Sequence, residues 1–316
     1  MSRPKISVVG AGSVGVACAT ELARREVGEI VLVDVSPDLP AGRALDLSQS
    51  GPIGGFHVPV TGTDDYEATA GSRVVVITAG TPRRPGMSRE DLFSVNSRTI
   101  RAVTERAAGA SPESVLILVT NPLDVMTCLA WKVSGFPKKR VMGQAGVLDS
   151  ARLRGFIAEA CGVSPLDVAA VTLGGHGDTM LPLTRYATVG GLPLETFLSE
   201  EQIRAVVDRT RAGGAEIVNL LKNGSAAIAP GLAAARMAES VARNSRRVMP
   251  CSVLLEGEYG CRGVFMGVPA VLGSGGVERI VEVALSPEET AAFRASAEAV
   301  RRGIEKLEPQ GDGNGT

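Results

Sequence analysis

Apolar residues in the first half of the chain gather in short runs rich in Val, Ile and Leu, and stretches with helical spacing lie between them. Such runs are typical of strands buried on both faces of a parallel sheet. Strands alternating with helices predict an α/β fold with right-handed crossovers. The predicted strands are Ile6–Val9, Glu29–Val33, Arg73–Thr78 and Val115–Val119, and the clearest helices are Ser13–Arg25 and Glu90–Ala108.

The pattern changes near residue 145, where the helices become longer and the strands look like hairpins. We therefore place a domain boundary near Gly143–Gly146. Two capping boxes predict helix starts, one at Ser199 with Gln202 and one at Ser286 with Glu289. The hairpin-like strands are expected near Val168–Thr172, Val248–Leu255 and Gly263–Val271. The polar, Gly-rich end, residues 309–316, is expected to be disordered.

The composition narrows the class of protein. The 316 residues carry 33 Lys and Arg against 34 Asp and Glu, and this balance argues against a nucleic-acid binder. With 44% hydrophobic and 21% charged residues, the chain has the composition of a globular protein. No apolar run reaches the roughly 18 residues that a membrane span requires.

The N-terminus and the cysteines bear on location. Arg3 and Lys5 precede an apolar stretch, and Ala17–Ala19 has the small residues of a signal-peptide cleavage site. The glycines within that stretch fit a strand–turn–helix better. The five cysteines are odd in number, scattered and without a CxxC motif, so reduced thiols in a cytoplasmic protein are expected.

A glycine-rich motif joins the first predicted strand to the first predicted helix. It reads Gly10-Ala11-Gly12-Ser13-Val14-Gly15, a GxGxxG. Gly10 allows a tight turn, Gly12 lets the backbone approach a pyrophosphate, and Gly15 lets the helix pack against the sheet. Phosphates would then lie at the helix N-terminus, where free N–H groups favour anions. The alternative is an ordinary glycine-rich turn.

Asp34 favours the dinucleotide interpretation. It follows Gly15 by 19 positions at the end of the second predicted strand, where a carboxylate binds a ribose 2′-hydroxyl. Asp34 would repel a 2′-phosphate, and Val35 and Ser36 offer no cation. NAD is therefore favoured over NADP. The predicted fold is a doubly wound Rossmann sheet over residues 1–145, followed by an α+β substrate domain over residues 146–308.

Histidine is the usual acid/base near neutral pH, and this chain has only two. His176 lies in Gly174-Gly175-His176-Gly177, where the glycines leave room for a ligand. His57 has no such setting and is expected at the surface or in a strand. A single histidine is often structural, so on this evidence alone the two interpretations of His176 are balanced.

Asp149 and Arg152 lie three positions apart on a predicted helix and so share one face. One interpretation is a local ion pair worth only tenths of a kcal/mol. The functional interpretation is that Asp149 orients a histidine while Arg152 holds a substrate carboxylate.

Three arginines, Arg83, Arg84 and Arg89, lie in a Pro- and Gly-containing loop after the strand Arg73–Thr78. Ligands bind at the carboxyl ends of such strands, so this loop suits a mobile lid that carries cations. A solvated run of charge is the commoner alternative.

Taken together, these motifs resemble the lactate/malate dehydrogenase family over residues 4 to about 307, most closely its lactate-dehydrogenase-like bacterial malate enzymes. The matching segments, in order, are Gly10–Gly15, Asp34, Thr78-Ala79-Gly80, Pro82–Arg89, Thr120-Asn121-Pro122, Leu148–Arg152 and Gly174–Thr179.

The resemblance implies an acid/base pair, His176 with Asp149, that exchanges a proton with the C2 hydroxyl of malate. It implies that Arg152 binds the C1 carboxylate, Arg83 the second carboxylate, and Arg89 the carbonyl oxygen from a closing lid. Ala226 occupies a place where lactate enzymes often carry Thr. The other implied contacts are Asn121 with the substrate oxygen, and Gly10–Gly15, Asp34, Thr78, Ala79, Gly80, Asn96, Val119 and Asn121 with NAD.

The implied partners are a small 2-hydroxy acid and further copies of the chain, as a homodimer or homotetramer, with no nucleic acid and no membrane. Two alternatives stay open. A lactate or other 2-hydroxy-acid dehydrogenase would share every site residue except Arg83. A non-catalytic dinucleotide-binding protein would tolerate the loss of His176.

Overall fold

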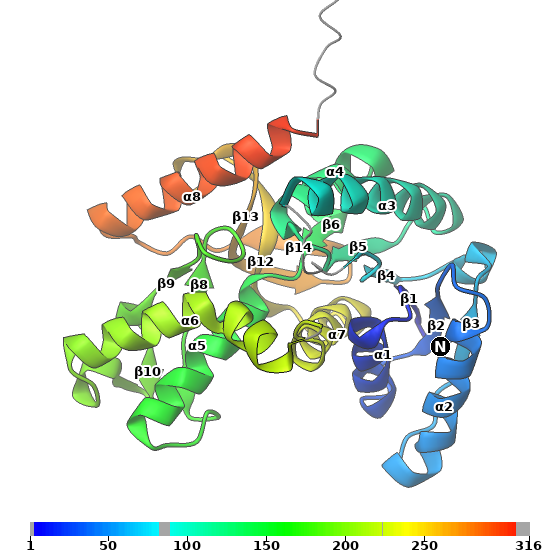
Figure 1. Cartoon of the computed structure of the whole chain (residues 1–316), viewed down its shortest axis with the longest axis horizontal. Helices are drawn as coiled ribbons and strands as arrows, with labels where there is room; N and C mark the ends of the chain where they lie inside the picture. The colour runs from blue at the N-terminus through cyan, green and yellow to red at the C-terminus, as the bar shows by residue number, and fades with distance from the viewer. Residues whose placement is uncertain (1–2, 82–88, 223, 308–316) are drawn as a thin grey trace, which may run out of the picture.

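The computed structural model describes residues 3–81, 89–222 and 224–307, with the backbone alone at Arg89 (Figure 1). The predicted tail, residues 309–316, lies outside this part of the chain. The main helices are α1 (Ser13–Arg24), α2 (Leu39–Gly54), α3 (Arg89–Ala110), α4 (Leu123–Ser134), α5 (Gly146–Cys161), α6 (Glu200–Leu221), α7 (Ile228–Ala242) and α8 (Pro287–Glu305). None of the helices in the described ranges is long and apolar enough to cross a membrane.

A mixed sheet forms the centre of the molecule. Within the described residues it has nine strands in the order β14-β13-β12-β6-β5-β4-β1-β2-β3. Its parallel strands are β1 (Lys5–Val9), β2 (Glu29–Val33), β3 (Val60–Thr63), β4 (Val74–Ile77), β5 (Val115–Leu118) and β6 (Val141–Gly143). The predicted parallel α/β fold is thus confirmed. The strand order reverses between β1 and β4, and ligands bind outside the carboxyl ends of strands at such a point.

Helices cover both faces of this sheet. α1 and α7 pack together on one face, and α3 and α4 pack together on the other (Figure 1). The strands are therefore buried on both sides, and Val74–Ile77 is fully inaccessible to solvent. This burial explains why these strands read as continuous apolar runs.

The C-terminal strands extend the same sheet. β12 (Arg247–Glu256), β13 (Arg262–Gly273) and β14 (Gly276–Ile280) form an antiparallel meander, and β12 joins β6 through the pair Ser252–Gly143. The two predicted hairpin strands are confirmed, as are the capping boxes at Ser199 and Ser286. The sequence did not indicate that the second half of the chain would continue the first sheet.

The predicted strand near Val168–Thr172 is wrong as a single element. The chain forms two short strands there, β7 (Val168–Ala169) and β8 (Thr172–Leu173), which belong to different sheets. β7 pairs with β10 (Thr188–Val189), which also pairs with β11 (Leu192–Pro193), whereas β8 pairs with β9 (Leu181–Pro182). The apolar run is continuous, but its partners differ, and a pattern along one strand cannot reveal them.

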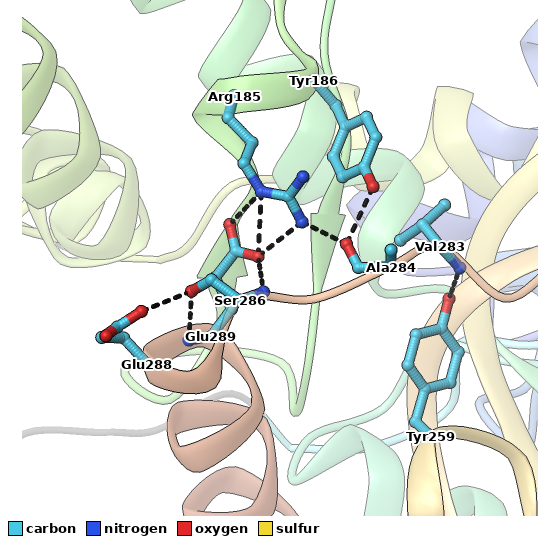
Figure 2. A network of polar contacts seen from close by, with 8 residues as sticks. All are labelled: Arg185, Tyr186, Tyr259, Val283, Ala284, Ser286, Glu288 and Glu289. Atoms are coloured by element: carbon cyan, nitrogen blue, oxygen red, sulfur yellow. Dashed lines mark hydrogen bonds and ion pairs between the residues drawn. The ribbon is translucent and has the colours of Figure 1, made fainter.

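A polar network fastens the start of α8 to the segment that follows β9 (Figure 2). Arg185 donates to the Glu289 carboxylate at 2.9 Å, and Glu289 also accepts from the backbone N–H of Ser286. Tyr186 donates its hydroxyl to the carbonyl of Ala284 at 2.8 Å. These contacts fix α8, which carries a side chain that supports the site described next.

Candidate active site

The glycine motif forms a tight turn between β1 and α1. Gly10 has φ +112°, a conformation that disfavours other residues. A Cβ at Gly15 would lie 1.8 Å from the carbonyl oxygen of Gly10, so only glycine lets α1 approach this closely. The hydroxyl of Thr78, after β4, donates to the same carbonyl at 3.1 Å and so ties the turn to the adjacent strand.

The N-terminus of α1 faces open space. Gly12 is exposed, and a Cβ built on it would meet nothing within 4 Å. The carboxylate of Asp34, after β2, accepts from the backbone N–H of Ala11 at 2.7 Å and from that of Ser36 at 3.0 Å. The turn, the helix N-terminus and the carboxylate are thus brought together, as a dinucleotide requires. Ser13 and Val14 lie in the first turn of the same helix.

The loops that follow β4 and β5 lie next to the glycine turn at the carboxyl ends of the parallel strands. Asn96 of α3 is 1% exposed; its amide oxygen accepts from the N–H of Thr81, and its amide nitrogen donates to the carbonyl of Asn121, both at 2.8 Å. Asn96 therefore holds the loops after β4 and β5 together. Ala79 and Gly80 lie in the first loop, and Val119 and the exposed Asn121 lie in the second.

His176 and Asp149 form a hydrogen-bonded pair at the same edge. Nδ1 of His176 lies 2.9 Å from Oδ2 of Asp149, a residue of α5 that is 2% exposed. Because the buried carboxylate accepts a hydrogen bond from the Nδ1–H group, Nε2 is left to face a substrate. His57, by contrast, is exposed and outside any strand.

The charges around His176 favour its protonated form. Burial lowers the pKa of His176, but the Asp149 carboxylate and its hydrogen bond raise it, and Asp124 adds to the rise, so the net pKa is above its ordinary value. Arg152 opposes this rise. Histidine changes its charge state near neutral pH more readily than other side chains, so His176 can both accept and release a proton there.

Arg152 lies in the same cluster with unused hydrogen-bonding capacity. Its Nη1 is 3.3 Å from Oδ1 of Asp149, while its Nε is buried with no hydrogen-bond partner. Burial lowers the pKa of Arg152, and Asp149 partly restores it. A buried guanidinium with an unpaired N–H is a ready site for a carboxylate.

The arginine side chains of the predicted lid lie outside the part of the chain that the structure describes. Arg83 and Arg84 lie outside the described residues, and so does the side chain of Arg89. Ala226 lies in an irregular segment before α7. In the described part of the chain, no group of three or more His, Cys, Asp or Glu side chains is arranged to hold a metal ion.

Sequence reasoning missed three polar residues around His176. They are the buried side chains Asp124, Ser252 and Ser296, each of which hydrogen-bonds to the histidine loop or to a residue that does. The signal for Asp124 was its place three positions after Asn121, a predicted site residue. Ser252 and Ser296 lie among ordinary strand and helix residues and gave no signal.

Comparisons with known proteins match this arrangement. Residues 4–143 match the family model for the lactate/malate dehydrogenase NAD-binding domain, and residues 146–310 match its α/β C-terminal domain. A malate dehydrogenase of Roseiflexus sp. is 55% identical over 96% of this chain and 99% of its own length. The malate dehydrogenase of Bacillus subtilis is 48% identical over 97% of this chain and 99% of its own.

Solved structures agree. A malate dehydrogenase from Salinibacter ruber superposes with a TM-score of 0.92 at 47% identity, covering 96% of this chain and 97% of that one. A lactate dehydrogenase from Cryptosporidium parvum, complexed with lactic acid and β-nicotinamide adenine dinucleotide, gives a TM-score of 0.93 at 40% identity, covering 97% and 98%. The backbone therefore does not separate the two substrate classes.

Fold and site together define a Rossmann-type, NAD-binding oxidoreductase in which a buried aspartate is paired with a partly buried histidine. The chain belongs to the lactate/malate dehydrogenase family.

Proposed function

We propose that the chain catalyses the reversible, NAD-dependent oxidation of (S)-malate to oxaloacetate. One observation carries the proposal: His176 is paired with Asp149, which also contacts Arg152, whose Nε is buried and unpaired. The backbone of His176 is bound to Asp124 at the start of the helix that follows β5, two strands along the sheet from β1 and its glycine turn. The curated relatives at 48–55% identity bear the name malate dehydrogenase.

His176 acts as the acid/base. With Nδ1 on Asp149, its Nε2 accepts the proton of the malate C2 hydroxyl during oxidation and returns it during oxaloacetate reduction. Asp149 fixes the tautomer and stabilises the imidazolium that forms. NAD, when bound, accepts a hydride from C2 of the substrate.

The substrate is a dianion, and arginines orient it. Arg152 pairs with the C1 carboxylate through the N–H groups that face the site. Arg83 pairs with the second carboxylate, and Arg89 polarises the carbonyl oxygen with help from Asn121. Holding both ends of the substrate directs one face of C2 to the cofactor.

The glycine turn and its neighbours hold NAD. The pyrophosphate lies against residues 10–15, and Asp34 accepts from the ribose hydroxyls in place of the backbone N–H of Ala11. The remaining contacts come from Thr78, Ala79, Gly80, Asn96, Val119 and Asn121. Residues 1–145 form the NAD-binding domain and residues 146–308 the substrate domain.

A steady-state comparison of four substrate–cofactor pairs tests the proposal. We expect kcat/KM for oxaloacetate to exceed that for pyruvate, and NADH to be preferred over NADPH. A preference for pyruvate would indicate a lactate dehydrogenase. Binding of NADH with no turnover of either acid, unchanged in His176→Asn, would indicate a non-catalytic dinucleotide-binding protein.

We place the enzyme in the cytoplasm, in the tricarboxylic acid cycle, as a homodimer or homotetramer. Exposed apolar side chains support self-association: Ile53 on α2 is 91% exposed, and Leu220 and Ile228, near the junction of α6 and α7, are 74% and 72% exposed. Sedimentation of the purified protein should give a mass two or four times that of the chain. A monomer at micromolar concentration would contradict this.

A further inference from the structure

The loop that carries His176 is held through three consecutive backbone N–H groups. Each donates to a different element, so the loop is supported by β13, α8 and α4 at once. The contacts are Gly174 N to Gly267 O at 2.9 Å, Gly175 N to Ser296 Oγ at 2.8 Å, and His176 N to Asp124 Oδ2 at 2.8 Å. Of the three acceptors, only Asp124 carries a charge.

Asp124 is a buried carboxylate, 4% exposed, in the first turn of α4. While Oδ2 accepts from His176, Oδ1 accepts from the hydroxyl of Ser252 on β12 at 2.6 Å. Both partners donate, which suits an ionised carboxylate. Asp124 thus links α4, β12 and the histidine loop, and it follows Asn121 by three positions.

Among the described residues, the charged groups that act on His176 come from two helices. α5 supplies Asp149 and Arg152, and α4 supplies Asp124. At their contacts with the loop, α8 and β13 offer a hydroxyl and a carbonyl, which carry no charge. Asp149 and Arg152 are paired with each other, so their effects on the imidazole partly cancel. The carboxylate of Asp124 therefore raises the pKa of His176 beyond the partly cancelled effect of Asp149 and Arg152.

Burial opposes the ionised form of Asp124. It raises the pKa of this carboxyl, and the hydrogen bonds from Ser252 and from the His176 amide lower it. An apolar residue would avoid this cost, so the presence of a carboxylate at this buried position points to a use for its charge.

We propose that Asp124 is a positioning residue that holds the His176 loop against α4 and acts as a second carboxylate beside the imidazole. The proposal rests on the role of His176 given above. It assigns Asp124 no contact with substrate or cofactor.

The test uses the two histidines of the chain. In the full-length protein, NMR titration of both imidazoles is compared between the parent and Asp124→Asn, with His57→Gln assigning the signals. Asn keeps an oxygen for the His176 amide and removes the charge. Its NH2 group then faces the Ser252 hydroxyl, which can accept from it instead of donating. We expect the titration of His176 to move to lower pH while that of exposed His57 stays in place. An unchanged His176 titration overturns the proposal.

Activity gives a second readout. At a pH above the His176 titration midpoints of both the parent and the variant, Asp124→Asn should lower kcat for oxaloacetate reduction by roughly 3- to 10-fold, because a smaller fraction of His176 is protonated. The KM for NADH should not change. The matched control, Asp46→Asn on the exposed face of α2, should change neither quantity. The imidazole titration needs no turnover, so failure of the proposed activity and failure of this inference are distinguishable.

A further variant covers the case in which Asp124→Asn does not fold. Ser252→Ala keeps the charge but removes the donor to Oδ1, which frees the carboxylate to turn away from the loop. We expect kcat to fall about 3- to 10-fold, again with the KM for NADH unchanged. A parental kcat in this variant overturns the positioning role.

Discussion

Nδ1 of His176 lies 2.9 Å from Oδ2 of Asp149, although 27 residues separate them along the chain. Asp149 lies on α5 and His176 follows β8, so the pair forms only when the second half of the molecule packs. The hydrogen bond fixes which imidazole nitrogen faces the substrate, and the first two predictions follow from it.

The pKa of His176 sets opposite pH dependences for the two directions. Malate oxidation requires the neutral imidazole, so its kcat/KM should rise with pH through a midpoint above the ordinary histidine value of about 6.5. Oxaloacetate reduction requires the imidazolium and should fall through the same midpoint. Initial rates from pH 5 to 10 in both directions provide the measurement. Midpoints below 6.5 would contradict the assignment.

Replacement of either member of the pair should impair turnover while NADH still binds. His176→Asn should lower kcat by roughly 10²–10⁴, the usual contribution of a positioned proton-transfer group. Asp149→Asn should be nearly as severe, because the amide favours the wrong tautomer and no longer stabilises the imidazolium. Stopped-flow single turnovers and NADH fluorescence titrations measure the two effects separately. Parental turnover in His176→Asn would exclude this residue as the acid/base.

Substrate selectivity should depend on Arg83 and not on Arg84. Pyruvate has a methyl group where oxaloacetate has its second carboxylate, so it would leave Arg83 without a partner. The loss is about 2–5 kcal/mol, or roughly 30- to several-thousand-fold in kcat/KM. Arg83→Gln should therefore depress oxaloacetate reduction and leave or raise pyruvate reduction.

Arg84→Gln is the matched control for this loop. It should leave the ratio of the two kcat/KM values unchanged. Collapse of the ratio in Arg84→Gln alone would assign the role to Arg84 instead. If neither variant moves the ratio, the loop does not recognise the dicarboxylate.

The preference for NADH should depend on Asp34. Its carboxylate is held at the glycine turn by the backbone N–H of Ala11, where it would meet a 2′-phosphate. Asp34→Ser combined with Val35→Arg should move the kcat/KM preference toward NADPH, because the repulsion is replaced by a cation. Val35→Arg alone serves as the control and should retain most of the NADH preference. Equal use of both cofactors by the parent would contradict the prediction.

Glu239 should contribute to stability without a role in turnover. It is 8% exposed and accepts from Arg25 at 2.8 Å and Arg243 at 2.9 Å, which links α7 to the end of α1. Glu239→Gln should lower the free energy of unfolding by about 1–3 kcal/mol. The exposed pair of Glu200 with Arg204 gives the control, since Glu200→Gln should cost under about 1 kcal/mol. Urea unfolding of both variants checks the difference, and equal effects would contradict it.

The sequence by itself determined four of the six parallel strands, β1, β2, β4 and β5, together with the glycine turn with Asp34 and the capping boxes at Ser199 and Ser286. These features depend on local patterns: apolar runs, glycines that permit one backbone conformation, and side chains that reach the next helical turn. It also indicated His176, Asp149 and Arg152 by residue type and flanking residues. The roles of Arg83 and Arg89 came from family resemblance and remain predictions.

Only the tertiary structure decided which distant groups meet. The pair Ser252–Gly143 continues the sheet across the two halves of the chain, and the β7 and β8 segments separate because each finds a different partner. Asp124 reaches the amide of His176 from another element, 52 residues away. Such contacts depend on how the elements pack together, and the residue pattern of one segment does not specify which other segment packs against it.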